Sequence, residues 1–207
     1  MILNELLQNI EKLTQNFDTI AEERKVQLET LSAYVQKKFD EQKTPKLIVI
    51  CTHNSRRSHL GQLWLAAAAD YYQLSALETY SGGTEATAFN PNAIAAVKRI
   101  GFQVSKLVEA ENPIYKIQWK EDQEAYQAFS KRFEEAPNPT QEFSAIMVCS
   151  EADEGCPFVP GTDFRIALPF DDPKAFDGTP QEAEKYDERT EQIGTEMLYV
   201  MSKVSVK

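Results

Sequence analysis

The feature that most constrains the fold is a short apolar run that ends at a cysteine and leads into a helical pattern. Residues 47–50 are all aliphatic, and Cys51 follows directly. A run of this length, rich in β-branched residues, is typical of a buried strand in a parallel sheet. After a loop, apolar residues recur at the spacing of one helix face: Leu60, Leu63, Trp64, Ala67 and Tyr71. The sequence therefore predicts strand, loop and helix, with Cys51 at the end of the strand.

The rest of the sequence after Pro45 continues this alternation. Strands are predicted at 77–81, 143–149 and 165–170, an extra strand at 114–119, and helices at 91–99 and 120–134. A last helix is predicted from Thr179, where Thr179, Pro180 and Glu182 form a capping-box pattern. Alternating strands and helices predict an α/β domain over residues 45–207, with a mostly parallel four-stranded sheet and helices on both faces.

Residues 1–44 read as a helical extension of that domain. Apolar residues recur at helical spacing in two stretches, and Asp18 and Thr19 are placed to cap the second helix. The residues between these apolar positions are charged. We expect a helical hairpin packed on the main domain, and the alternative is a surface for a homodimer or another partner.

Bulk properties exclude several classes of protein. The net charge is −10, which disfavours nucleic acids and anionic membranes as partners. No apolar run reaches the roughly 18 residues that a membrane span needs. The first residues lack the basic and apolar regions of a signal peptide, so the expected location is the cytoplasm.

The loop after Cys51 carries the clearest chemical signal. Ligands of α/β sheets bind at the carboxyl ends of strands, and a helix N-terminus offers free N–H groups and a positive dipole end. The residues predicted to surround a phosphate-like oxyanion are Thr52, His53, Asn54, Ser55, Arg56, Arg57 and Ser58. Arg57 offers a planar fork for two oxygens, and Ser58 can donate a hydrogen bond to the Cys51 thiolate. The two histidines, His53 and His59, could add positive charge. The plainer alternative is that Cys51 is an inert buried cysteine.

The pattern Cys-x5-Arg-Ser with an internal Asn resembles the low-molecular-weight protein tyrosine phosphatase family. The resemblance implies that Cys51 attacks phosphorus and that Arg57 and the loop amides stabilise the transition state. Asp172-Pro173 matches the family's Asp-Pro pair, so the general-acid role passes to Asp172 by resemblance. Without that match, residues 171–173 would be read as a turn.

Two further cysteines follow the predicted strand 143–149. Five of the six residues between Cys149 and Cys156 are polar, charged or glycine, so we expect exposed thiols joined by a flexible loop, rather than two buried small side chains. The segment resembles the Cys-x6-Cys-Pro segment of thioredoxin-coupled arsenate reductases. That resemblance implies a relay in which Cys51, Cys149 and Cys156 act in turn and thioredoxin reduces the final disulfide.

We therefore expect an arsenate reductase. The alternatives are a phosphatase that forms a phosphocysteine, and a non-enzymatic protein that senses an anion or binds a partner. The reductase chemistry implied by the resemblance needs no metal or organic cofactor. Asn54 and Ser81 match potassium ligands in the family, but Gln62 stands where an acidic ligand is usual, so no metal is predicted.

Overall fold

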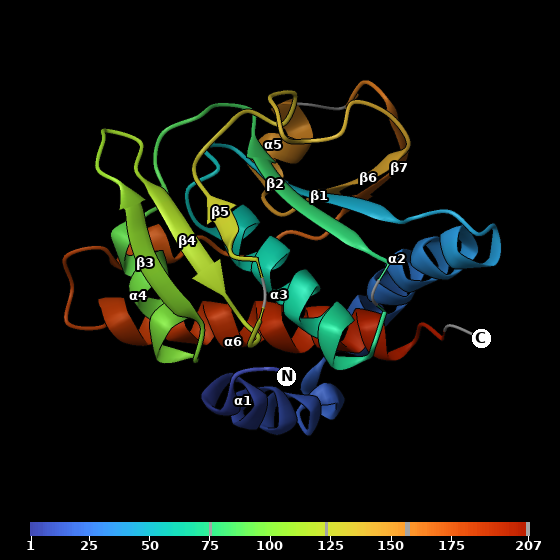
Figure 1. Ribbon diagram of the computed structural model, residues 1–207, viewed down its shortest axis with the longest axis horizontal. Helices are drawn as coiled ribbons and strands as arrows, with labels where there is room; N and C mark the ends of the chain where they lie inside the picture. The colour runs from blue at the N-terminus through green and yellow to red at the C-terminus, as the bar shows by residue number, and fades with distance from the viewer. Residues whose placement is uncertain (75, 123, 156–157, 206–207) are drawn as a thin grey trace.

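The protein is described by a computed structural model that covers residues 1–74, 76–122, 124–155 and 158–205 (Figure 1). Within these residues, four strands form one parallel sheet in the order β2-β1-β6-β7. The strands are β1 (Lys46–Cys51), β2 (Glu78–Gly83), β6 (Phe143–Met147) and β7 (Thr162–Ala167). The predicted four-stranded parallel sheet flanked by helices is confirmed.

Strand β1 lies inside the sheet, which explains its uninterrupted apolar sequence. All residues from Leu47 to Cys51 are buried. Ile50 is in register with Gly82 of β2 on one side and with Met147 of β6 on the other. Because all four strands run in the same direction, the residues that follow them gather at one edge of the sheet. Cys51 is therefore placed at the edge where α/β proteins bind ligands.

One long helix packs on the sheet, and a second long helix packs on the first. Helix α3 (Arg57–Tyr71) packs on β1 and β2, and α6 (Glu182–Ser202) packs on α3. A Cβ atom on Gly61 would lie 2.9 Å from a methyl carbon of Val49, so this glycine allows α3 to approach β1 closely. Helix α4 (Pro91–Arg99) lies against α6, and the short α5 (Ser150–Gly155) contacts β1 and β6. No helix in the described ranges is both long enough and apolar enough to cross a membrane.

A second sheet replaces one predicted helix. Strands β3 (Gln103–Val108), β4 (Ile114–Gln118) and β5 (Tyr126–Ala128) form a three-stranded antiparallel sheet. The strand predicted at 114–119 is present, but the helix predicted for 120–134 is wrong. Ala128 pairs with Tyr115 of β4 and is fully buried. Sheet pairing and burial thus outweigh the helical propensity of this charged stretch.

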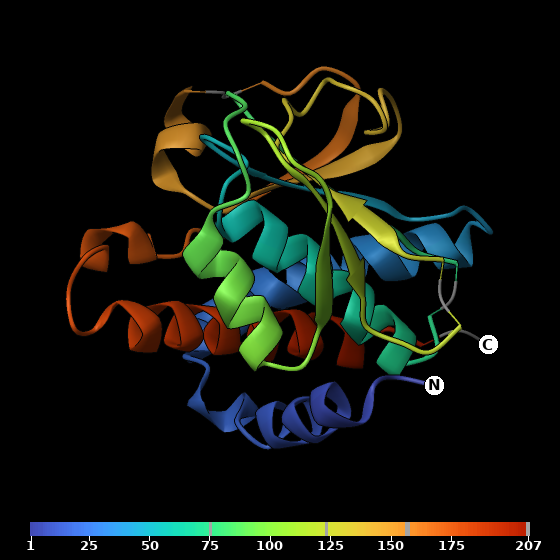
Figure 2. The same ribbon diagram turned by 60° about the vertical axis from the view of Figure 1, so that its left-hand side comes forward.

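The N-terminal residues form α1 (Asn4–Thr14), a 3-10 turn η1 (Phe17–Thr19) and α2 (Glu22–Asp40). Both helices pack on α6, and α1 lies on the side of α6 away from the sheet in both views (Figures 1 and 2). The apolar faces of the two helices are used in this packing: Leu6, Ile10, Leu13, Leu28, Leu31 and Val35 are all buried.

Two predicted helix caps differ from the structure. Asp18 and Thr19 belong to the 3-10 turn, and Ala21 precedes α2 without a side-chain cap. Helix α6 begins at Glu182, whose carboxylate accepts a hydrogen bond from the Gly178 N–H at 2.7 Å. The Thr179 hydroxyl accepts a hydrogen bond from Gln181 N at 3.3 Å. Thr179 and Glu182 therefore bond to Gln181 and Gly178, and the helix starts three residues later than predicted.

Candidate active site

Residues 51–58, called the anion loop below, join β1 to the first turn of α3. The carbonyl groups of this loop point outward and accept hydrogen bonds from surrounding segments. Cys51 O accepts from Thr84 N at 3.1 Å, and Thr52 O accepts from Glu85 N at 2.8 Å. The carbonyls of His53 and Ser55 are bonded by Ser130 Oγ at 3.0 Å and by Asn90 N at 2.9 Å. These bonds fix the loop from outside.

Unlike its carbonyls, several amide N–H groups of the anion loop lack a partner among the described residues. In the described part of the chain, the N–H groups of residues 52–55 have no protein acceptor. They lie at the N-terminus of α3, where the helix dipole favours negative charge. The loop is therefore arranged to bind a tetrahedral anion through its backbone.

The Cys51 thiol is hydrogen-bonded inside this loop. Its sulfur lies 3.0 Å from Ser58 Oγ, and Asn54 Nδ2 donates to that same oxygen at 2.8 Å. Because Ser58 Oγ accepts from Asn54, its hydroxyl hydrogen is free to point at the sulfur, where it would stabilise a thiolate. Asn54 is fully buried and has a φ of 44°, a left-handed conformation that asparagine tolerates better than most residues.

Arg57 connects the anion loop to residues 168–173, called the acid strap below. Its guanidinium donates to Phe170 O at 2.8 Å and to Asp172 Oδ2 at 2.6 Å. The other Asp172 oxygen accepts from Lys174 N, at the start of the 3-10 turn η2 (Pro173–Phe176). Arg57 Nε is buried and has no partner among the described residues. A bound anion would satisfy this donor.

The neighbouring Arg56 turns to another part of the molecule. Its guanidinium donates to the Tyr186 hydroxyl at 2.7 Å and pairs with Asp177 at 3.2 Å. The loop is thereby tied to α6. The Arg56 guanidinium thus contacts Tyr186 and Asp177, whereas the sequence predicted that it would contact the oxyanion.

The two histidines differ in their surroundings. His53 is exposed, with Nε2 3.7 Å from a Glu85 carboxylate oxygen. His59 is fully buried and stacks on Phe89 with a centroid distance of 4.0 Å. Burial lowers the pKa of His59 well below its ordinary value, so it is neutral at pH 7. The positive charge expected from His59 is therefore absent.

Lys131 supports the anion loop and was missed by the sequence reasoning. Its backbone N–H donates to Asn54 Oδ1 at 2.9 Å. Its side chain is buried, and the ammonium lies 4.7 Å from the centroid of the Phe129 ring. Burial lowers the pKa of Lys131 to about 8. Lys131 lies in the stretch predicted as a helix, where nothing in the sequence suggested a buried lysine.

Cys149 lies beside the anion loop, contrary to the expectation of an exposed thiol in a flexible segment. Its exposed fraction is 1%, and its sulfur is 3.4 Å from the Thr52 hydroxyl. The residues after it form α5 rather than a loop. Cys149 follows β6, which is the immediate neighbour of β1. In this register Cys149 lies opposite Thr52, and the position inside the sheet buries it. Cys156 lies outside the described residues.

The structure thus brings Cys51, Asn54 and Ser58 together, joins Arg57 to Asp172, and places Cys149 next to Thr52. Within the described ranges there is no group of three or more His, Cys, Asp or Glu side chains suited to hold a metal ion.

Comparisons with known proteins agree with this geometry. No protein-family model matches the chain. An arsenate reductase from Halalkalibacterium halodurans is 30% identical over 133 residues, which are 64% of this chain and 77% of the relative. Arsenate reductase 2 from Staphylococcus epidermidis is 32% identical over 60% of this chain and 75% of its own length. The Bacillus subtilis arsenate reductase is 28% identical over 72% of this chain and 88% of its own length.

Solved structures show the same fold at lower sequence identity. A low-molecular-weight phosphotyrosine phosphatase from Vibrio cholerae O395 matches with a TM-score of 0.51 and 13% identity, over 76% of this chain and 95% of the phosphatase. An arsenate reductase in a phosphate-binding state matches with a TM-score of 0.50 and 16% identity, over 78% of this chain and all of the neighbour. The chain is therefore an enzyme of the arsenate reductase family, built on the low-molecular-weight tyrosine phosphatase fold.

Proposed function

We propose that the protein reduces arsenate to arsenite, with Cys51 as the nucleophile and Cys149 as the second thiol. The observation that carries the proposal is the position of Cys149. The residue next to Cys51, Thr52, has its hydroxyl 3.4 Å from the Cys149 sulfur. A phosphatase needs only the first thiol. A second thiol buried beside the anion loop suits a thiol exchange with Cys51.

The first step would use the anion loop and the acid strap. The loop amides and Arg57 would bind arsenate, and the Cys51 thiolate would attack arsenic to form an As–S bond. An oxygen leaves as water after it takes a proton from Asp172, which acts as general acid. The Arg57–Asp172 contact of 2.6 Å places the carboxyl group next to the arginine that would hold the anion.

The second step transfers two electrons to arsenic. The Cys149 thiolate would attack the Cys51 sulfur, so the S–S bond forms, the As–S bond breaks, and its electron pair reduces As(V) to As(III). The two sulfurs must meet for this exchange, and Cys149 starts beside the anion loop, with its sulfur 3.4 Å from the hydroxyl of Thr52. Thiol exchange requires such direct approach.

The last step would restore the resting enzyme. The Cys156 thiolate attacks Cys149, a Cys149–Cys156 disulfide forms, and the Cys51 thiolate is released. Thioredoxin, supplied with electrons by NADPH, reduces that disulfide. The role of Cys156 and the choice of thioredoxin rest on the Cys-x6-Cys-Pro resemblance. A reducing cytoplasm, in which thiols remain reduced, is part of the same proposal.

The experiment follows NADPH oxidation with arsenate, thioredoxin and thioredoxin reductase. We expect steady oxidation with the wild type and none with Cys51→Ser or Cys149→Ser. Hydrolysis of an aryl phosphate serves as the matched control, because Cys149→Ser should retain any such activity and Cys51→Ser should lose it. Arsenate turnover that persists in Cys149→Ser would exclude the relay.

A phosphatase acting on phosphoesters is the second candidate. The Arg57–Asp172 pair favours it, since the same carboxyl group could protonate the alkoxide or phenoxide that leaves a phosphoester. This candidate predicts hydrolysis of an aryl phosphate that depends on Cys51 and Asp172, together with no NADPH oxidation in the arsenate assay. That combination of results would replace the reductase proposal.

A further inference from the structure

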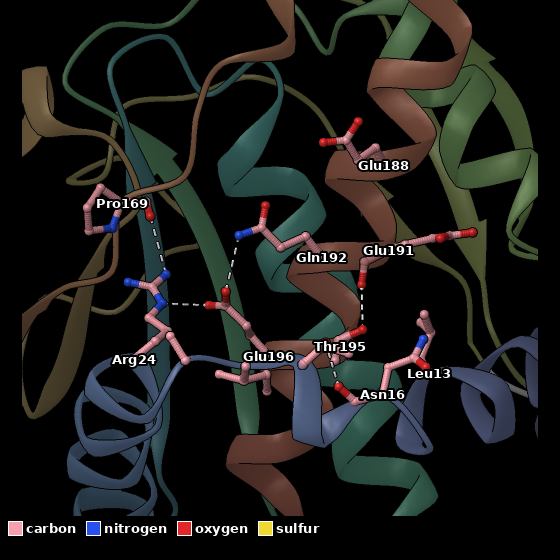
Figure 3. A pocket seen from close by; sticks show the side chains of 12 residues that line it. Leu13, Asn16, Arg24, Pro169, Glu188, Glu191, Gln192, Thr195 and Glu196 are labelled. Carbon is pink, nitrogen blue, oxygen red and sulfur yellow. Dashed lines mark hydrogen bonds and ion pairs between the residues drawn. The ribbon is translucent and has the colours of Figure 1, made fainter.

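Arg24, at the start of α2, reaches from the N-terminal helices to the acid strap (Figure 3). Its Nε donates to Glu196 Oε2 of α6 at 2.8 Å, and another guanidinium nitrogen donates to Pro169 O at 3.3 Å. Its guanidinium carbon also lies 4.9 Å from the centre of the Phe170 ring. One planar guanidinium therefore joins the extension, α6 and the strap, and a lysine ammonium is too compact to reproduce all three contacts.

The Arg24–Glu196 pair is mostly shielded from water. The exposed side-chain fractions are 16% for Arg24 and 6% for Glu196. Burial raises the pKa of Glu196 and Arg24 opposes that rise, so the carboxylate depends on the arginine. By contrast, the Arg189–Asp171 contact with the strap is 3.5 Å long and its carboxylate is 95% exposed, which makes it weak. Glu196 thus holds in place the arginine that contacts Pro169 and Phe170 of the strap.

The strap lies between Arg24 and Arg57. Arg24 holds the Pro169 carbonyl and stacks on Phe170, while Arg57 holds the Phe170 carbonyl and the Asp172 carboxylate. A movement at residues 169–170 is therefore transmitted to the carboxyl group only two residues further on. The packing of α1 and α2 on α6 fixes the position from which Arg24 acts.

We propose that the N-terminal extension is part of the catalytic machinery, and that Arg24 is a positioning residue that holds the acid strap so that Asp172 stays beside Arg57 and the anion loop. The inference rests on the proposed function, in which Asp172 is the general acid. It assigns to the extension a role in proton transfer rather than in packing alone.

The test uses the full-length protein with all three cysteines reduced, mixed with arsenate, and measures arsenite formed in a single turnover. Arg24→Met keeps much of the apolar stem and should lower the maximal rate by about 10- to 100-fold, because a misplaced catalytic group costs this much. The arsenate concentration that gives half the maximal rate should change little, since the anion loop is untouched. Arg24→Lys should recover part of the rate, through the charge opposite Glu196.

Arg99→Met is the matched control. Arg99 also pairs with a carboxylate of α6, Asp187, at 2.7 Å, but its contacts with Asp187 and Ala183 lie away from the strap. The Arg99→Met variant should have the wild-type rate. In an Asp172→Asn background, Arg24→Met should have no further effect, because the group it positions is gone. Equal losses in both backgrounds would overturn the proposal, as would an unchanged rate in Arg24→Met.

A second measurement separates this proposal from the proposed function. If the wild type forms no arsenite, the proposed reaction fails, and amide hydrogen exchange then tests the positional claim alone. The N–H groups of Leu168 and Phe170 are bonded to Met147 O and Val148 O. Their exchange should accelerate about tenfold or more in Arg24→Met and not in Arg99→Met, while the amides of residues 60–70 stay unchanged. Equal exchange in wild type and Arg24→Met would overturn the inference.

Discussion

The anion loop and the acid strap border the same site, but different kinds of interaction hold them. The carbonyls of Cys51, Thr52 and Ser55 are bonded by backbone N–H groups from residues 84–90. The strap is also bonded to the end of β6, but its position over the site depends on the guanidinium groups of Arg24 and Arg57. Backbone donors survive most substitutions, whereas a guanidinium contact is lost with one. The hydrogen bonds that hold the loop should therefore survive the loss of a neighbouring side chain, and those that hold the strap should not.

The largest expected effect separates anion binding from proton transfer. Asp172→Asn removes the proposed proton donor but leaves the loop intact, so arsenite formation should fall by about 10²- to 10⁴-fold. The affinity for inorganic phosphate, measured by calorimetry, should stay the same or rise, because a negative charge beside Arg57 is removed. Asp171→Asn is the control, since that carboxylate is 95% exposed. A phosphate affinity that falls as far as the rate would contradict the division between loop and strap.

A smaller effect should appear where the loop leaves no space for a side chain. A Cβ on Gly83 would lie 2.2 Å from Glu85 O, 2.6 Å from Asn54 N and 2.7 Å from Thr52 O. All three are backbone atoms, so Gly83→Ala should lower the free energy of unfolding by about 3 kcal/mol, at the upper end of overpacking effects. Urea denaturation measures this change. Gly155→Ala, where nothing lies within 4 Å, is the control. If Gly83→Ala lowered the free energy of unfolding by less than about 1 kcal/mol, the loop would be held less firmly than its contrast with the strap requires.

The smallest effect concerns the buried lysine beside the loop. Because burial lowers the pKa of Lys131 to about 8, the folded protein binds this proton more weakly than the unfolded chain does. The lysine therefore lowers stability below about pH 8, and this deficit disappears as the pH rises toward the ordinary lysine pKa of 10.5. Lys131→Met should raise the free energy of unfolding at pH 7 by on the order of 1–2 kcal/mol. Denaturation of the wild type and Lys131→Met should show a smaller difference in the free energy of unfolding at pH 10 than at pH 7. A difference that grew with pH would contradict the lowered pKa of Lys131.

The same contrast explains what could be predicted from the sequence. Strand β1, the loop and α3 are encoded by neighbouring residues, so the apolar run before Cys51 and the helical spacing after it were sufficient. The same patterns predicted β6, α4 and a four-stranded parallel sheet. Cys51, Asn54 and Ser58 were candidates for the same reason, and the structure places them in contact.

Features that depend on distant residues could not be predicted in this way. Local composition suggested that Cys149 is exposed, but pairing of β6 with β1 buries it. The charged stretch 120–134 has helical propensity, but pairing with β4 makes part of it a strand. Arg24 could not be recognised as a contact of the strap, because its partners Pro169 and Glu196 lie 145 and 172 residues away in the chain.

The outward-facing carbonyls of the anion loop bear on how an enzyme with the proposed activity would distinguish arsenate from phosphate. A loop shaped before the anion arrives offers the same N–H groups to any tetrahedral dianion of suitable size. Phosphate should therefore compete with arsenate for the free enzyme, and the loop itself offers little means to exclude it. Discrimination must then arise after binding, because arsenic accepts an electron pair from a thiol far more readily than phosphorus does. In a cell rich in phosphate, the working rate of the enzyme would depend on the ratio of the two anions rather than on the amount of arsenate alone.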